Sequence, residues 1–384
     1  MSDRKSARKK RSLAAWAGNA VSLLIGAAVG GISVAALLPM AGDNDALYFI
    51  YLVVLMAGLV LAFGVQIIVH EGGHLVCGLM SGYRFLSFNV FGLIWTRGED
   101  GKLHMKRMQI AGAGGQCLMA PPEYNGGDFP FVLYNLGGVL ANLVSAAVCG
   151  LLALLIPLNA ISILLVKQAI VGVFFALTNG VPLTTEALQN DGKNILAIRR
   201  SEHARRAFWV QMALAAEMTR GTRLRSMPDE WFAPFPEEEM DNAIVCAVAV
   251  QNTSRLMDQL DFAGALGAIR ALLDRKKGVI GLYRMTMTCD GAVCELIAGE
   301  PGPLTEAIEQ PDVQQMMKAM KDHPTILRTQ YALALLKERD GEKAGKLLAA
   351  FDAAAAKHAY PQEVAGEREI LLAIQNAVLT GGAA

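Results

Sequence analysis

The sequence predicts a mainly α-helical membrane protein with three parts: a bundle of about four membrane-spanning helices, a β-hairpin region associated with the membrane, and a cytoplasmic helical domain. Three observations predict it. Hydrophobic residues form 53% of the 384 residues and charged residues only 18%, whereas about a quarter is usual in soluble proteins. Long apolar runs precede residue 193, and amphipathic segments follow it. Between two of the runs, residues 82–128 lack helical periodicity.

The first two spans follow a basic leader. Residues 1–12 carry six Lys or Arg residues and one Asp, which predicts a cytoplasmic leader. Residues 13–40 form an apolar stretch that is about twice as long as the hydrophobic region of a signal peptide, so we expect a retained span. A short polar break precedes the second span, 46–80.

The third and fourth spans, 129–157 and 159–182, are separated by a very short turn. Basic residues gather before the first span, in 84–107 and after the fourth span, and the other two turns have none. By the positive-inside rule, both termini are then cytoplasmic. We expect an integral protein of a bacterial plasma membrane.

The segment between the second and third spans alternates apolar and polar residues around a Gly-Glu-Asp-Gly turn at 98–101. This pattern predicts a β-hairpin. The glycines and prolines that follow, up to residue 127, predict irregular chain. Backbone of this kind is tolerated at membrane depth only where protein or a water-filled cavity surrounds it.

The region 193–384 has the periodicity of successive amphipathic helices. We expect helices at about 193–220, 236–254, 258–275, 279–298, 310–321, 324–340, 341–358 and 361–379. Stacked helical hairpins similar to tetratricopeptide repeats are one interpretation, and an irregular bundle is the other. A regulatory protein is the partner we expect for this region.

Two histidines and a glutamate end the second apolar run, as His70-Glu71-Gly72-Gly73-His74. Positions i and i+4 share one face of a helix, so His70 and His74 can present two nitrogens to one metal ion. Glu71 is placed to accept a proton from an attacking water. Ionisable groups in a membrane segment cost several kcal/mol and usually have a function. The motif therefore predicts a hydrolytic zinc site.

A catalytic zinc ion needs a third protein ligand. A histidine at position 80 would complete one familiar pattern, but the residue there is Met80. Acidic residues beyond the fourth span remain as candidates. Asp191, which precedes a glycine, is our choice, and Glu186 is the alternative.

Three separated elements resemble the site-2 protease family of intramembrane zinc metalloproteases, and its bacterial members in particular. They are His-Glu-x-Gly-His, the Gly138…Asn142 pair in a middle span, and Asn179 and Pro182 followed by Asp191-Gly. The family usually has about four residues between this proline and the aspartate, whereas residues 183–190 intervene here. The resemblance covers about residues 46–200.

The resemblance implies a transmembrane metalloprotease domain over 13–192. It implies Zn²⁺ as cofactor with ligands His70, His74 and Asp191. It also implies Glu71 as catalytic base, and Asn142 and Asn179 as contacts of the substrate or the oxyanion. Residues 84–120 would form a membrane-associated β element.

The expected function is that of a zinc-dependent intramembrane endopeptidase, with a transmembrane protein as substrate and the lipid bilayer as environment. Lys plus Arg and Asp plus Glu both number 35, and no large basic patch favours nucleic acid. Two alternatives stay open. One is an inactive membrane scaffold or adaptor with a helical-repeat tail, and the other is a membrane-bound zinc protease of cytoplasmic peptides.

Overall fold

The computed structural model describes residues 31, 44–97, 102–107, 114–126, 129–182, 190–358 and 360–381. The chain divides into two compact units. The first contains Met1–Cys77, Val132–Thr185 and Gln189–Lys193, and the second contains the remainder. The sheet region thus groups with the C-terminal helices, whereas the sequence analysis placed 82–128 within the membrane domain.

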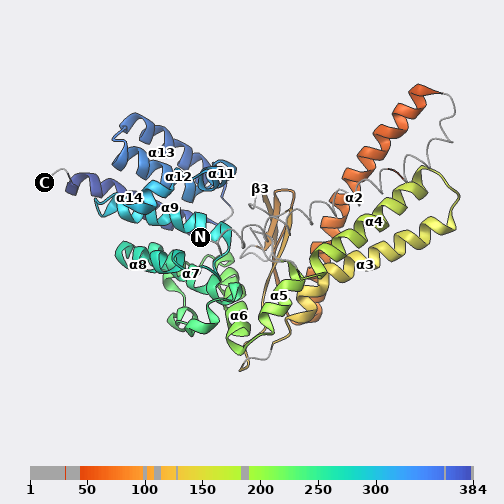
Figure 1. Cartoon of the computed structure of the whole chain (residues 1–384), viewed down its shortest axis with the longest axis horizontal. Helices are drawn as coiled ribbons and strands as arrows, with labels where there is room; N and C mark the ends of the chain where they lie inside the picture. Colours follow the sequence, from red (N-terminus) through yellow and green to blue (C-terminus); the bar gives the residue numbers. More distant parts are fainter. Residues whose placement is uncertain are drawn as a thin grey trace, which may run out of the picture. The chain divides into compact units, whose positions relative to one another are not determined.

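The first unit is built on three long helices, α2 (Asp45–Met80), α3 (Val132–Leu155) and α4 (Ala160–Gly180) (Figure 1). All three are long and apolar enough to cross a membrane. They correspond to the expected second, third and fourth spans. The expected first span, 13–40, lies outside the described residues except for Gly31.

Local chemistry explains how these helices begin and pack. Asn159 caps α4 because its side chain accepts hydrogen bonds from the amides of Ile161 and Ser162. The turn before it is short, so α3 and α4 pack as an antiparallel pair. Lys167 of α4 is buried, and its ammonium donates to the carbonyl of Leu55 in α2 at 2.6 Å. This hydrogen bond satisfies a cation that could not stay unpaired among apolar helices.

The second unit begins with a four-stranded antiparallel sheet in the order β3-β2-β1-β4. Its strands are β1 (Arg84–Val90), β2 (Leu93–Arg97), β3 (Leu103–Arg107) and β4 (Gly115–Ala120). Phe91 and Gly92 join β1 to β2 with positive φ angles of 53° and 74°, the conformation that tight hairpin turns require.

The sheet is larger than the hairpin that the sequence analysis predicted. The β2–β3 pair corresponds to that hairpin, and its turn at 98–101 lies outside the described residues. Strand β4 falls in a segment whose composition predicted irregular chain, so that expectation was wrong, whereas the resemblance implied β structure up to residue 120. Its pairing with β1 spans a long stretch of chain and buries Met119 and Ala120.

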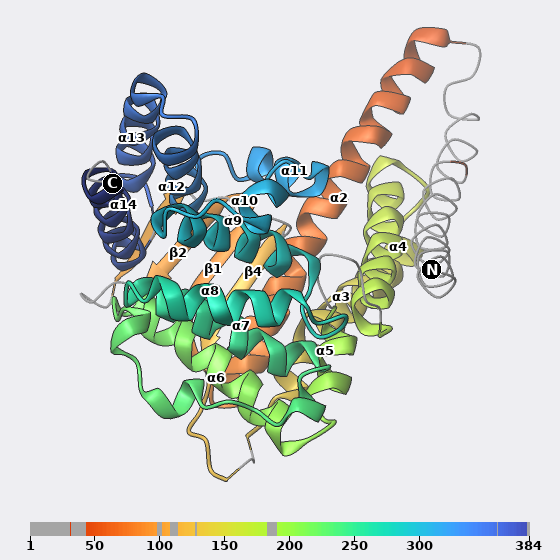
Figure 2. The same cartoon turned by 60° about the vertical axis from the view of Figure 1, so that its left-hand side comes forward.

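The remainder of the second unit is helical (Figure 2). Its helices are α5 (Asp191–Ile198, whose first residues belong to the first unit), α6 (Glu202–Thr219), α7 (Ala243–Asp258), α8 (Phe262–Leu273), α9 (Gly281–Ile297), α10 (Pro303–Ala307), α11 (Pro311–Ala319), α12 (Pro324–Ala332), α13 (Gly341–Ala355) and α14 (Pro361–Gly381). Short 3₁₀ turns lie at Leu224–Ser226 (η1), Asp229–Phe232 (η2) and Glu237–Glu239 (η3), and a π turn at Leu333–Lys337 (η4).

The helix pattern was predicted well, with two differences. The expected helix 193–220 is two helices, because Ser201 caps α6 by accepting from the amide of Ala204. Helix α10 was missed. Consecutive helices from α6 to α10 pack on one another, while α14 returns to α12 and α7. A tetratricopeptide-like array is therefore not established.

Candidate metal centre

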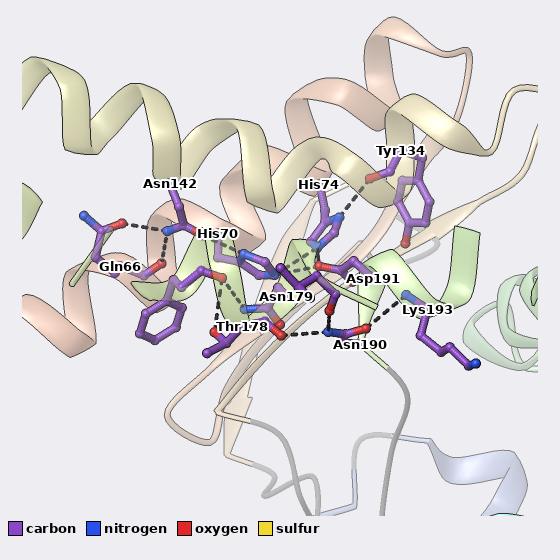
Figure 3. A network of polar contacts seen from close by, with 12 residues as sticks. Gln66, His70, His74, Tyr134, Asn142, Thr178, Asn179, Asn190, Asp191 and Lys193 are labelled. Carbon is purple, nitrogen blue, oxygen red and sulfur yellow. Dashed lines mark hydrogen bonds and ion pairs between the residues drawn. The ribbon is translucent and has the colours of Figure 1, made fainter. Parts of the chain in front are cut away.

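Three side chains of the first unit converge at the site: His70 and His74 from α2, and Asp191 from the start of α5 (Figure 3). One Oδ atom of Asp191 lies 3.1 Å from Nε2 of His70 and 3.5 Å from Nε2 of His74. The two Nε2 atoms are 3.2 Å apart. A tetrahedral zinc ion with ligands at about 2.0–2.1 Å would hold its ligand atoms about 3.3–3.4 Å apart. The three donor atoms could therefore hold a metal ion.

The hydrogen bonds of the two Nδ1 atoms show that the Nε2 atom of each imidazole faces the candidate metal position. Nδ1 of His74 lies 2.8 Å from the backbone carbonyl of Tyr134, which can only accept, so this nitrogen carries the proton. Nε2 of neutral His74 then presents a lone pair to the site. The arrangement is the usual one for a metal-ligating histidine, whose other nitrogen donates to a backbone carbonyl or an amide.

His70 is oriented by a buried amide network. Its Nδ1 lies 2.7 Å from Oδ1 of Asn142, whose amide nitrogen donates to the backbone carbonyl and the side-chain oxygen of Gln66 at 3.0 and 2.6 Å. Because the backbone carbonyl fixes the orientation of the Asn142 amide, Nδ1 of His70 must be the donor. Two lone pairs and a carboxylate oxygen therefore meet within hydrogen-bond distance. A cation would satisfy all three.

The surroundings of Asp191 also favour a bound cation. Its Oδ2 atom is buried and accepts no hydrogen bond from the described residues. Burial by itself would raise the pKa of this carboxyl, but protonated imidazoles at His70 and His74 would lower it to about 2, and a cation bound in their place would act in the same direction. Asp191 is thus an anionic donor at neutral pH.

The close approach of α3 to the histidines depends on a glycine. A Cβ atom at Gly138 would lie within 2.6 Å of three atoms of the His70 ring. Gly72, by contrast, faces open space, with nothing within 4 Å of a Cβ atom. Gly138 therefore lets the backbone of α3 cover one face of the metal centre.

Asn190 holds the start of α5, and Asp191 with it, against the end of α4. Its amide nitrogen donates to the carbonyls of Thr178 and Val181 at 2.7 and 2.6 Å, at the end of α4. Its Oδ1 accepts from the amide of Lys193 at 3.0 Å and so stabilises the first turn of α5. This residue joins the two helix ends on either side of residues 183–189.

The other predicted residues take the following places. Glu71 is buried in α2 directly after His70. Asn179 lies in the last turn of α4, near Asp191 in Figure 3, and its amide donates to the carbonyl of Phe175. Glu186, the alternative ligand, lies outside the described residues. Asn142 is fully buried and is hydrogen-bonded to His70 and Gln66, and its contact with substrate or oxyanion stays a prediction.

Two contributors were missed from the sequence. Gln66 is the only amide side chain in the run 46–69 before the motif, lies one turn before His70, and could have been suspected for that reason. Asn190 precedes Asp-Gly at a helix start, which is a capping signal. Comparisons with protein-family models, with curated proteins and with solved structures found no match.

Proposed function

We propose that the chain is a zinc-dependent intramembrane endopeptidase that hydrolyses peptide bonds of membrane-spanning proteins. The observation that carries the proposal is the convergence of two imidazole lone pairs and one carboxylate oxygen at edge lengths of 3.1–3.5 Å. The resemblance to site-2 proteases supports the same chemistry. Both histidines lie on a helix apolar enough to cross a membrane, which favours a substrate within the bilayer.

Each residue of the site has its own role in the proposed hydrolysis. Zinc, when bound by His70, His74 and Asp191, supplies an electrophile that acidifies water and polarises a peptide carbonyl. Glu71 accepts the proton of the attacking water and delivers it to the departing amine nitrogen. Asn142 fixes the ring of His70 through Nδ1. Asn179 is the remaining amide near the site and is our candidate for a substrate or oxyanion contact.

Metal analysis of the purified chain tests the ligand set. We expect about one zinc per chain in the wild type. Loss of zinc is expected in His70→Ala and Asp191→Ala, because either change leaves two protein ligands. Glu186→Ala is the matched control and should retain the metal. If Glu186→Ala loses zinc while Asp191→Ala keeps it, the third ligand is Glu186.

Cleavage of a reporter membrane protein tests the activity. Glu71→Gln should keep the zinc and abolish cleavage, because the amide cannot accept the proton of the attacking water. A Glu71→Gln variant that cleaves at the wild-type rate would refute the role of Glu71. Absence of any Glu71-dependent cleavage by a zinc-loaded wild type would favour the scaffold alternative. Cleavage sites outside apolar segments would favour the protease of cytoplasmic peptides.

A further inference from the structure

The helical part of the second unit encloses a cavity of about 260 Å³ that the proposed protease chemistry does not use. Residues from η1, α7, α9, α12 and α14 line it. Four carboxyl groups and two guanidinium groups face it, together with three methionines. A cavity with so many charged groups differs from the apolar packing that otherwise forms the core of this region.

Both guanidinium groups in the lining are already neutralised. Arg328 is 1% exposed and pairs with Asp290 and with Glu367, whose Oε2 lies 3.2 Å from Nε. Arg223 pairs with Asp258 and, from outside the lining, with a glutamate of α14. An anionic ligand would therefore have to displace existing ion pairs, which makes the cavity unsuitable for an anion.

Glu363 of α14 is the lining carboxyl group without a Lys or Arg partner among the described residues. Its nearest ion-pair candidate is Nε2 of His358, 3.8 Å away. Nδ1 of His358 accepts from the amide of Tyr360 at 3.2 Å, and burial lowers the pKa of this imidazole, so it stays neutral. Burial and the neighbouring Glu367 raise the pKa of Glu363 to about 7. Once ionised, this carboxyl group has no Lys or Arg within ion-pair distance in the described part of the chain to compensate it.

The apolar part of the lining suits an aliphatic stem. Met218, Met257 and Met320 face the same cavity, together with Ile370. Methionine side chains are flexible and polarisable, so they adapt to unbranched chains of different lengths. The cavity thus combines an apolar wall with an uncompensated carboxyl group.

We propose that this cavity binds an alkylammonium group, with its cation paired to Glu363 and its aliphatic stem against the methionines. The group comes either from a free small amine or from a lysine side chain of a peptide. An ammonium ion would supply the missing cation and donate hydrogen bonds to the carboxylate. The site is independent of the metal centre.

Calorimetric titration of the purified full chain at about pH 8 tests the proposal. Two probes distinguish the sources: cadaverine for a free amine, and N-acetyl-lysine methylamide for a side chain. 1-Pentanol is the neutral control. We expect saturable binding of at least one amine and none of the alcohol. The probe that binds more tightly identifies the source. No saturable amine binding, or equal binding of the alcohol, would overturn the proposal.

Substitution locates the binding. Glu363→Gln keeps the shape of the side chain and should weaken amine binding by about tenfold or more, the equivalent of one ion pair. Glu342→Gln is the control, because this glutamate of α13 is 82% exposed and is not among the residues that line the cavity. Unchanged affinity in Glu363→Gln would contradict the assignment. If that variant does not fold, the pH dependence of amine binding by the wild type tests the assignment instead. The affinity must fall when the pH is lowered through about 7, because Glu363 is then protonated.

Discussion

His70 and His74 are oriented by acceptors of different kinds. The carbonyl that accepts from His74 belongs to the backbone of α3, so no side-chain substitution removes it. The acceptor of His70 is the side chain of Asn142, which Gln66 holds in turn. Gln66 donates to Ser145 and to the carbonyl of Gln168 at 3.1 Å. The orientation of His70 is therefore the one that mutagenesis can test.

Asn142→Ala should weaken zinc binding by about 10–100-fold, because His70 loses the acceptor that fixes its tautomer and ring position. Competition with a chelator of known affinity measures the effect. Asn159→Ala is a control in the same unit, since it loses the helix cap of α4 and about 1 kcal/mol of stability but touches neither histidine. Equal zinc affinity in Asn142→Ala and wild type would remove Asn142 from the metal centre.

At the residue scale, the sequence singled out His70, His74 and Asp191, which the structure brings together, because spacing and membrane context are local signals. It could not predict that Asn142 contacts His70, since that contact depends on how α3 lies against α2. The same holds for the carbonyl of Tyr134, because a backbone acceptor has no signature in the sequence.

Helix packing decides whether the ligands meet. The contact of Gly138 with the ring of His70 leaves no space for a methyl group, and the ring cannot turn away without losing the hydrogen bond to Asn142. Gly72 lies two residues after His70 but on an open face of α2. The packing at this site thus requires a glycine at position 138 but not at position 72.

Gly138→Ala should lose most of the bound zinc, because α3 must shift or His70 must rotate to admit the new methyl group. Gly72→Ala should keep the zinc, since nothing lies within 4 Å of the added atom. In this position alanine favours the helix by about 1 kcal/mol relative to glycine. Metal content and thermal unfolding of both variants form the measurement. Full zinc occupancy in Gly138→Ala would show that α3 does not pack on His70 as described.

At the element scale, long apolar runs predicted α2, α3 and α4 to within a few residues. The residue pattern alone missed strand β4, which only the resemblance placed in a β element, because glycines and prolines flank it and because its partner, β1, is not adjacent in the sequence. Helix α10 was missed because five residues are too few to show a period. Local patterns predict long elements, whereas short elements depend on their tertiary partners.

The molecule as a whole comprises a unit with the candidate metal centre and a unit with the charged cavity. Within the second unit, Glu363 shares its surroundings with other titratable and charged groups. They are Glu367, His358, His323, Arg328, Asp290, Asp258 and Arg223. Folding raises the pKa of Glu363 from 4.5 to about 7. The folded state therefore holds this proton more tightly than the unfolded chain.

The stability that Glu363 contributes should be complete below pH 4.5 and be lost as the pH rises through about 7. Hydrogen exchange of α14 in the full chain, at about pH 6 and pH 8, should show less protection at the higher pH after correction for intrinsic rates. Glu363→Gln should reduce this difference, and Glu367, whose pKa burial also raises, accounts for what remains. His323, whose pKa burial lowers to about 4, acts in the opposite direction and is common to both proteins. An identical pH response in the two proteins would contradict the prediction.

The clamp that Asn190 makes across α4 and α5 has a practical consequence for protein engineering. Its hydrogen bonds to Thr178 and Val181 hold together the residues on either side of the connection 183–189. These hydrogen bonds do not depend on how many residues the connection contains. By the general scaling of loop-closure entropy, each doubling of the number of residues between two fixed ends costs only about 0.6 kcal/mol. The connection is therefore a suitable place to insert an epitope tag or a fluorophore-binding sequence, which would report on Asp191 from a few residues away.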